Sequence, residues 1–252
     1  MSVSPKHTDR LKKYLKGHET VFGSRPASPT LEFGCGAGDL LIAAHEMGMT
    51  FFGIDVSEVR LAEFQQKPDS AKASDFFRLY DGDILPFRSE YFGSIYSWFV
   101  LENILDLSTS LRELVRVTKV GGTLCLITQE TFNYFDGHCN VYWPPYFPRR
   151  FFRPYMEEHG FDGKQIAYME SSVFYVTTSQ ISSILAFLGC KIVSAAAPLN
   201  EKRRNDALDN LALNVDTERK ARILARQVKQ FMKSGEWSPP ERNIIIWAQR
   251  EM

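Results

Sequence analysis

The chain has 252 residues, of which 44% are hydrophobic, and this suits one large α/β domain. Its 30 basic and 30 acidic side chains give a formal net charge of zero, which favours neither nucleic acid nor an acidic membrane as a partner. The sequence has no long apolar run and no secretory signal, and its 4 cysteines form no C-x-x-C pair. We therefore expect a cytoplasmic protein with reduced thiols, no transmembrane segment and no metal site.

Residues 1–29 are expected to form an N-terminal helix and a linker. Leu11, Tyr14 and Leu15 recur at helical spacing, and a stretch rich in proline and serine follows at residues 24–29. This helix precedes the first strand of the predicted sheet.

The sequence TLEFGCGAGDLL at residues 30–41 joins a short apolar run, three alternating glycines and the start of a helix. This order brings backbone amides and a positive helix N-terminus beside a ligand. Gly38 comes one position too early for the dinucleotide fingerprint G-x-G-x-x-G, and Asp39 stands where its third glycine belongs. Because an aspartate would repel a pyrophosphate, a ligand with a cationic or zwitterionic part, such as S-adenosylmethionine, fits better.

The next two strands end at residues that suit such a ligand. Asp55 closes the predicted strand at residues 50–55, where its carboxylate can accept hydrogen bonds from both ribose hydroxyls. The alternative for Asp55 is to cap the next helix, although Ser57 is available for that role. After the third strand, Asp83 can accept from the exocyclic amine of adenine while Ile84 packs on the ring.

The rest of this half of the chain continues to alternate between strands and helices. The third, fourth and fifth strands are predicted at residues 76–80, 91–98 and 123–127, with an amphipathic helix at 108–118.

The ordered motifs LEFGCGAG, FFGIDVS, DGDILPF, FVLENI and LRELVRVTKVGGTLCLIT, within residues 28–130, resemble the methyltransferase type 11 group of the class I S-adenosylmethionine-dependent methyltransferases. The resemblance implies a binding site for S-adenosylmethionine, and for the product S-adenosylhomocysteine, at Glu32, Gly34, Cys35, Gly36, Gly38, Asp55, Val56, Asp83 and Ile84. Trp98 and Phe99 are expected near the sulfur. One departure is Asn103, because many relatives have a histidine after V-L-E, so no role of that histidine is carried over.

The resemblance also implies the fold: an α/β, Rossmann-like, seven-stranded and mostly parallel sheet with helices on both faces. The sixth strand is expected at residues 191–197, and the last strand, at 243–249, runs antiparallel between the fifth and the sixth. The chain is then one methyltransferase domain over residues 1–252, with its cofactor-binding half at 30–130 and a C-terminal half at 173–252.

Two segments have an unusual composition but no clear periodicity of apolar residues. Residues 131–172 are rich in aromatic residues and proline, so we expect a lid insertion rather than an ordinary connection. Its aromatics either cover the acceptor, with His138 or Tyr142 near the methyl group, or form a small core of their own. Residues 200–242 form a helical excursion, which packs on the domain, forms a homodimer face or contacts the substrate through basic side chains.

These features predict a methyltransferase that moves a methyl group from S-adenosylmethionine to a small-molecule or glycan acceptor, at an oxygen. The glycan option depends on a similarity of the late part of the chain to bacterial methyltransferases of glycan or lipid-linked pathways. A hydroxyl acceptor needs a base, and the candidates are His138, Tyr142 and Glu102. The alternative is a catalytically inactive S-adenosylmethionine-binding partner or regulatory protein. Asp39 and the early Gly38 disfavour a nicotinamide-dependent oxidoreductase, and the absence of an N-P-P-[YF] motif disfavours methylation of nucleic acid.

Overall fold

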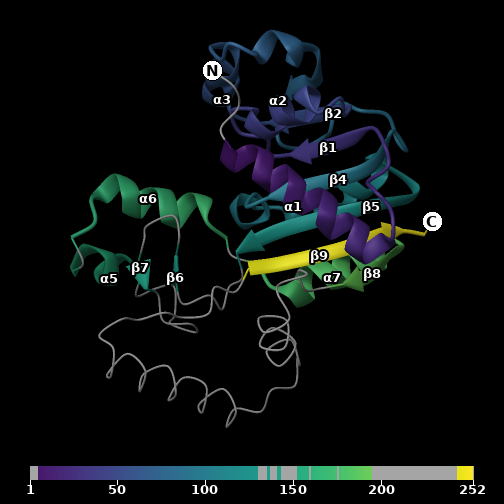
Figure 1. The fold of residues 1–252 in the computed structure, drawn as a ribbon. Coiled ribbons are helices and arrows are strands. Elements are labelled where there is room, and N and C mark those ends of the chain that lie inside the picture. Colours follow the sequence, from purple (N-terminus) through teal and green to yellow (C-terminus); the bar gives the residue numbers. More distant parts are fainter. Residues whose placement is uncertain are drawn as a thin grey trace, which may run out of the picture.

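The computed structural model describes residues 5–129, 135–136, 141–142, 152–158, 160–174, 176–194 and 243–251. Within them, seven strands form one sheet in the order β3-β2-β1-β4-β5-β9-β8 (Figure 1). The strands are β1 (Thr30–Phe33), β2 (Phe51–Asp55), β3 (Phe77–Leu79), β4 (Phe92–Trp98), β5 (Thr118–Gln129), β8 (Cys190–Ser194) and β9 (Asn243–Arg250). The predicted excursion at residues 200–242 lies outside the described residues.

The direction of the strands matches the prediction. The first five strands pair in parallel, from β3 through β2, β1 and β4 to β5. Strand β9 lies between β5 and β8 and is antiparallel to both. The prediction of a C-terminal strand inserted antiparallel between the fifth and sixth strands is therefore confirmed. The predicted third strand was too long by one residue at each end, because Phe76 closes a 3-10 turn, η2 (Ser74–Phe76).

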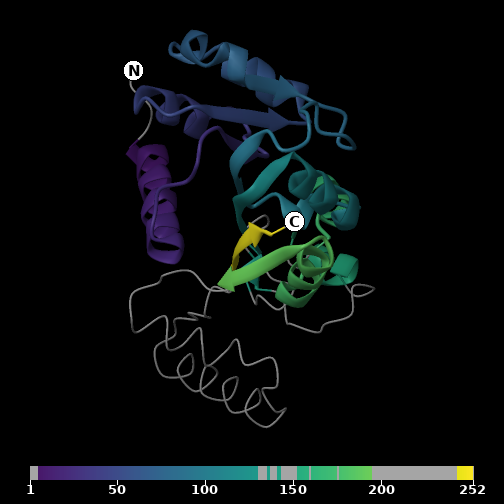
Figure 2. The same ribbon diagram turned by 90° about the vertical axis from the view of Figure 1, so that its right-hand side faces the viewer.

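Helices cover both faces of this sheet (Figure 2). The long helices are α1 (Pro5–Phe22), α2 (Asp39–Glu46), α3 (Glu58–Gln65), α4 (Leu107–Val117), α5 (Phe152–Glu158), α6 (Gly163–Ser172) and α7 (Thr178–Phe187). Short 3-10 turns occur at η1 (Ser70–Lys72) and η3 (Leu101–Asn103), and a small hairpin joins β6 (Phe135–Asp136) to β7 (Val141–Tyr142).

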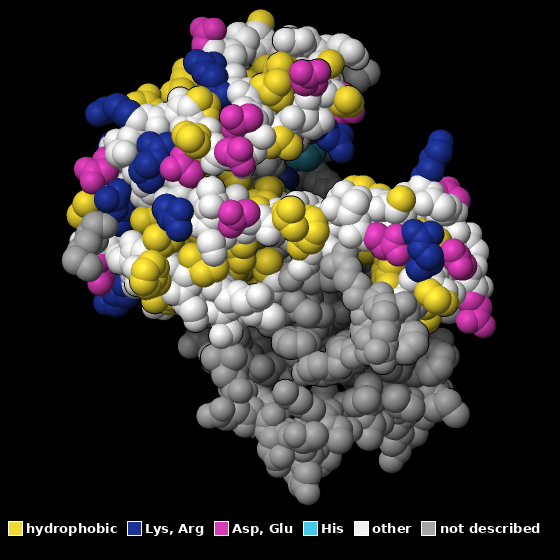
Figure 3. Space-filling model, turned by 180° about the vertical axis from the view of Figure 1, so that it is seen from behind, with side chains coloured by type: hydrophobic (Ala, Val, Ile, Leu, Met, Phe, Trp, Pro, Cys, Tyr) yellow, Lys and Arg dark blue, Asp and Glu magenta, His cyan; other side chains and the backbone are white. Residues whose placement is uncertain are grey.

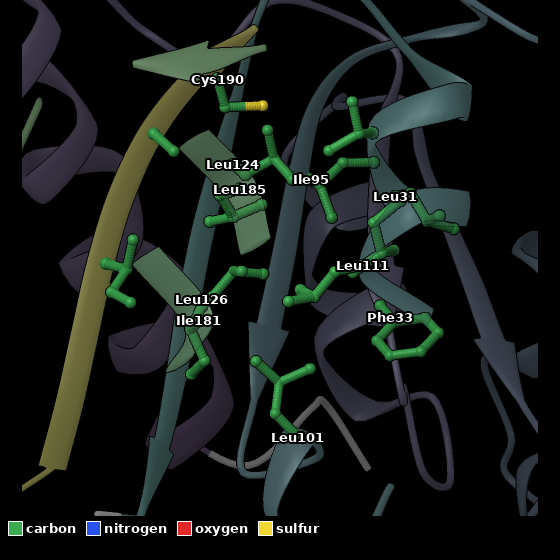
Figure 4. Close-up of a cluster of buried hydrophobic side chains, with 14 of the residues drawn as sticks. Leu31, Phe33, Ile95, Leu101, Leu111, Leu124, Leu126, Ile181, Leu185 and Cys190 are labelled. Atoms are coloured by element: carbon green, nitrogen blue, oxygen red, sulfur yellow. The ribbon is translucent and has the colours of Figure 1, made fainter. Parts of the chain in front are cut away.

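The central strands β1, β4 and β5 are buried on both faces over most of their length, and successive side chains enter different cores. On β5, Leu124 and Leu126 pack with α4 and α7, as Figure 4 shows for Leu111, Ile181 and Leu185. Cys125 and Ile127 of the same strand face the other core, to which α1, α2 and α3 contribute. This alternation follows from the two-residue period of a strand, and it accounts for apolar runs that have no polar face.

The segment after β5 carries a third, separate core. Phe152 and Met156 of α5 pack against Ile166 and Met169 of α6, with Tyr155 and Phe161 at the margin. Of the aromatics in the predicted insertion, Phe152 and Tyr155 therefore belong to a small core of their own, and the cover for the acceptor stays a prediction. The guanidinium of Arg153 on α5 pairs with the carboxylate of Glu170 on α6 and joins the two helices.

Candidate active site

The carboxyl ends of β1, β2, β3 and β4 meet at one edge of the sheet because these strands are parallel. The helices α5 and α6 lie beyond this edge (Figure 1), and the surface is hollowed between them and the lobe that contains α2 and α3 (Figure 3). A crevice at the carboxyl ends of parallel strands is where α/β folds bind their ligands. The loops that follow the four strands are therefore the candidate site.

The glycine loop after β1 has two kinds of glycine. The amides of Gly34 and Cys35 both donate to the carbonyl of Ile54 at 2.9 Å, which fastens the loop to β2. A Cβ on Gly34 would lie 2.2 Å from Cγ2 of Val100, so this glycine is needed for packing. Gly36 has a φ of +54° and nothing within 4 Å of its missing Cβ. The loop is therefore bare at Gly36, where a ligand can approach the backbone.

The carboxylate of Asp55 lies beside this bare position. Its Oδ2 accepts a hydrogen bond of 2.8 Å from the amide of Gly36, and its Oδ1 accepts one of 3.0 Å from the amide of Ser57. The side-chain cap of α3 is Ser57, whose hydroxyl accepts from the amide of Arg60 at 3.3 Å. Asp55 thus joins the tip of β2 to the glycine loop, and each carboxylate oxygen keeps a lone pair for a further donor.

The loops after β2 and β3 together expose an apolar surface. The side chains of Val56 and Ile84 are 57% and 68% exposed, which is unusual for aliphatic residues. The loops adjoin, because a Cβ on Gly82 would lie 3.8 Å from Cγ1 of Val56. Asp81 closes a turn by accepting from the amides of Asp83 and Ile84 at 3.0 and 3.4 Å. Asp83 is exposed at the tip of this turn, and a flat ring can pack on the two aliphatic side chains.

Glu32 lies beneath the glycine loop and pairs with the N-terminal helix. Its carboxylate accepts a hydrogen bond of 2.7 Å from Nη2 of Arg10 on α1, while the side chain of Glu32 is 2% exposed. Burial raises the pKa of Glu32 to about 8, and the guanidinium of Arg10 opposes part of this rise. Its Oε2 has no hydrogen-bond partner within the part of the chain that the structure describes.

Arg10 is the functional candidate that the sequence did not reveal. It lies one helical turn before Tyr14, on the face of α1 that is otherwise apolar, and this position was the available signal. Its guanidinium carbon lies 5.8 Å from the centre of the Trp98 ring, within the range of a cation–π contact.

The residues after β4 form an aromatic wall beside the loop. Phe99 has a φ of +54°, a conformation that bulky side chains rarely adopt, and its amide donates to the carbonyl of Ile127 at 2.7 Å. The rings of Trp98 and Phe99 meet edge to face with their centres 5.3 Å apart. Val100 then packs on Gly34, so the strained residue brings this segment against the glycine loop.

The three predicted catalytic residues are placed very differently. Glu102 is completely buried in η3, and its carboxylate accepts a hydrogen bond from the hydroxyl of Thr128. Its carbonyl accepts from the amide of Phe174 at 2.6 Å, which ties the chain after α6 to this loop. These contacts give Glu102 a positioning role, and its role as a base stays a prediction. The backbone of Tyr142 belongs to β7, whereas its side chain and all of His138 lie outside the described residues.

The charge of Asp39 is paired with a neighbouring cation. Its carboxylate pairs with Nζ of Lys67 at 2.6 Å, and the same Nζ donates to the carbonyl of Ala37 at 2.8 Å. His7 lies 3.8 Å away on the other side. Because Lys67 balances the charge of Asp39, that charge by itself does not exclude a pyrophosphate.

The described residues contain no group of three or more His, Cys, Asp or Glu side chains that could hold a metal ion. Among the described helices, none is long and apolar enough to cross a membrane.

Comparison with known proteins agrees with this geometry. Residues 31–126 match the family model of the methyltransferase domain. The chain is 30% identical over 126 residues to a demethylmenaquinone methyltransferase of Bacillus mycoides, covering 48% of this chain and 53% of the relative. A demethylmenaquinone methyltransferase of Bacillus cereus is 31% identical over 127 residues, with the same coverage. The chain thus spans about half the length of the curated relatives it matches.

Solved structures extend the likeness in fold to the rest of the chain. An S-adenosylmethionine-dependent methyltransferase from Mesorhizobium loti aligns with 88% of this chain and 90% of its own, at 19% identity and a TM-score of 0.53. A geranyl diphosphate methyltransferase in complex with S-adenosylmethionine aligns with 96% of this chain and 85% of its own, at 15% identity and a TM-score of 0.56. Residues 31–126 therefore match the methyltransferase domain, and the chain shares the fold of solved S-adenosylmethionine-dependent methyltransferases.

Proposed function

We propose that this protein transfers the methyl group of S-adenosylmethionine to a small-molecule acceptor. The observation that carries the proposal is the set of loops at the carboxyl ends of β1, β2 and β3. There the open side of Gly36, the carboxylate of Asp55 and the exposed side chains of Val56 and Ile84 come in this order. This order matches the parts of the cofactor: an amino acid end, a ribose and an adenine.

The residues at this edge fit the cofactor. The space beside Gly36 admits a ligand that a side chain would exclude, and the buried Oε2 of Glu32 lacks a partner that an ammonium group would supply. Glu32 and the glycine loop would hold the amino acid end, Asp55 the ribose, and Asp83 with Ile84 the adenine. When bound there, S-adenosylmethionine supplies an electrophilic methyl group on a sulfonium.

The contribution of the chain is then chiefly alignment. Holding two reactants in line removes several kcal/mol from a barrier, on the order of 7 to 11 in favourable cases. Trp98 and Phe99 form a fixed wall on the sulfur side. The guanidinium of Arg10 is held at 2.7 Å by the carboxyl group of Glu32 beneath the glycine loop.

The class of acceptor rests on the relatives. A demethylmenaquinone methyltransferase and a geranyl diphosphate methyltransferase are both named for small acceptors, which supports a small molecule over a macromolecule. We propose a hydroxyl oxygen as the acceptor atom, with His138 or Tyr142 as the base; a glycan hydroxyl belongs to the same class. One structural neighbour, from Streptomyces coelicolor, is a geranyl diphosphate C-methyltransferase, so a carbon acceptor is the competing outcome.

The cytoplasm is the proposed location. The support is chemical: Cys35, Cys125 and Cys190 are all free and buried thiols, as expected of a protein kept in a reducing compartment.

The first experiment is a calorimetric titration with S-adenosylmethionine, S-adenosylhomocysteine and NADH in parallel. We expect micromolar binding of both adenosyl ligands and none of NADH. The matched variants are Asp55→Ala, which removes the proposed ribose contact, and Asp69→Asn, which changes an exposed ion pair away from the site. Absence of binding by both adenosyl ligands would refute the proposal.

The second experiment follows the label from S-adenosylmethionine into quinol, isoprenoid and glycan acceptors. Transfer, followed by NMR of the product, identifies the acceptor atom. Tight binding of the cofactor without transfer to any acceptor class would favour the alternative of a catalytically inactive binding partner.

A further inference from the structure

An ion pair on α4 lies outside the candidate site but contacts one of its loops. Glu113 and Arg116 are one helical turn apart, and Nε and Nη2 of the guanidinium donate to the two carboxylate oxygens at 2.7 Å each. This is the bidentate geometry that makes Arg–carboxylate pairs strong and directional. The guanidinium of Arg116 also lowers the pKa of Glu113, so the pair is ionised at neutral pH.

The same two side chains bind the backbone of the loop after β3. Oε2 of Glu113 accepts from the amide of Leu85 at 2.9 Å, and Nη2 of Arg116 donates to the carbonyl of Leu85 at 3.0 Å. Nη1 of Arg116 donates to the carbonyl of Phe87 at 2.9 Å. One ion pair thus binds three backbone groups of this loop. The carbonyl of Leu85 also accepts from the amide of Phe87 at 2.7 Å, whereas the ion pair supplies the partners of the Leu85 amide and the Phe87 carbonyl.

These contacts fix the base of a loop whose tip is exposed. The other end of the loop is fastened by the amide of Tyr80, which donates to the carbonyl of Asp55 at 3.2 Å. Between these two anchors, Asp83 and Ile84 face solvent. The side chain of Leu85 is 2% exposed and packs in the core, so the clamp sets the direction in which the tip leaves the sheet.

We propose that Glu113 and Arg116 are positioning residues that hold Asp83 and Ile84 in place for the adenine ring, and so set the selectivity for adenine. The inference rests on the proposed function, because it assigns the loop to the adenine of S-adenosylmethionine. Neither side chain touches the ligand. They raise affinity by keeping the loop in its binding conformation, since apparent affinity falls in proportion to the fraction of competent protein.

A purely structural role would predict something different. If this half-buried ion pair served only to stabilise the fold, its loss would lower the melting temperature without changing which base is preferred. The distinguishing readout is therefore a ratio of affinities for two ligands that differ only at N1 and the exocyclic group of the base.

The experiment measures by calorimetry the binding of S-adenosylhomocysteine and of S-inosylhomocysteine. In the second ligand an oxygen replaces the exocyclic amine of the base. The variants are Arg116→Gln, Arg116→Lys and Glu113→Gln. The control is Arg112→Gln, which removes the same charge from an exposed position of the same helix. Melting curves show that each variant is folded at the temperature of the titration.

We expect the wild type to prefer S-adenosylhomocysteine. Arg116→Gln should weaken its binding about tenfold, which is the loss expected if one tenth of the loop stays competent. The preference over S-inosylhomocysteine should shrink with it, because protein with a displaced loop binds either ligand without contacting its base. Arg116→Lys keeps the charge but loses the bidentate guanidinium, so its affinity should lie between those of the wild type and Arg116→Gln. Arg112→Gln should have the affinity of the wild type.

Two results separate the failure of this inference from that of the proposed function. If the wild type does not bind S-adenosylhomocysteine, the proposed function itself is refuted. If it binds, but without preferring adenine, or if the folded Arg116→Gln and Glu113→Gln variants keep the preference of the wild type, the positioning role of the clamp is overturned.

Discussion

The carboxylate of Asp55 and the amide of Gly36 are joined by a hydrogen bond of 2.8 Å, so the acidic tip of β2 holds the centre of the glycine loop. The residue proposed to bind the ribose also shapes the backbone proposed to bind the amino acid end of the cofactor. Changes at Asp55 should therefore affect the whole ligand rather than the ribose alone.

Asp55→Ala should weaken the binding of S-adenosylhomocysteine by about 2 kcal/mol, or roughly thirtyfold, because hydrogen bonds to a charged group are lost on both sides. Ser57→Ala removes the cap of α3 and should cost about 1 kcal/mol of stability with little change in affinity. Calorimetry and melting curves check both.

By contrast, His138→Ala should chiefly slow turnover. Equal losses of affinity in Asp55→Ala and His138→Ala would contradict this division of roles.

Gly36→Ala and Gly34→Ala should fail in different ways. Alanine at position 36 meets no neighbour and costs about 1 kcal/mol for its left-handed conformation, yet its methyl group occupies the ligand side of the loop. It should fold and lose cofactor affinity. Alanine at position 34 collides with Val100, so we expect a loss of about 3 kcal/mol of stability. Melting temperature and the dissociation constant of S-adenosylhomocysteine separate the two cases, and a Gly36→Ala variant with normal affinity would place the ligand elsewhere.

At about pH 9, where Glu32 is ionised, Arg10→Met should destabilise the fold by about 3 kcal/mol, since it leaves the carboxylate of Glu32 buried without its cation. Adding Glu32→Gln should restore part of this stability, because the amide has no charge to desolvate. Denaturant unfolding of both single variants and the double variant gives the coupling free energy. A coupling near zero would mean that the ion pair contributes nothing in solution.

His18 should make the stability depend on pH. Its Nδ1 lies 2.6 Å from the carbonyl of Ser24, which can only accept, so Nδ1 carries the proton and Nε2 accepts from the hydroxyl of Thr123 at 2.9 Å. Burial lowers the pKa of His18 below its usual 6.5, although the carbonyl of Ser24 opposes the shift. The unfolded chain then binds a proton below pH 6.5 that the folded chain resists, so stability falls as the pH drops through this range.

The test compares the wild type with His18→Gln, which cannot titrate there. The variant should be less stable at pH 7.5, and the difference in unfolding free energy should narrow towards pH 5.5 by at most about 1.4 kcal/mol, the linkage of one proton over one pH unit. A constant difference between the two unfolding free energies over this range would show that His18 does not titrate differently in the folded state.

The sequence by itself determined the features that depend on neighbours along the chain. The strand, glycine loop and helix at residues 30–46 follow from local periodicity and from glycines with positive φ, and the structure has them where they were predicted. The antiparallel place of β9 was also predicted, but from the resemblance to a family, because an apolar run such as NIIIWAQ does not reveal its direction.

Only the tertiary structure decided which charged groups meet. Arg10 reaches Glu32, Lys67 reaches Asp39, and Arg116 reaches the loop at Leu85, across separations of about 20 to 30 residues. Such pairs depend on how helices pack across a sheet, and composition and spacing do not encode this. The same physical reason applies to Asp39, because the effect of its charge on a ligand depends on Lys67, its partner in space.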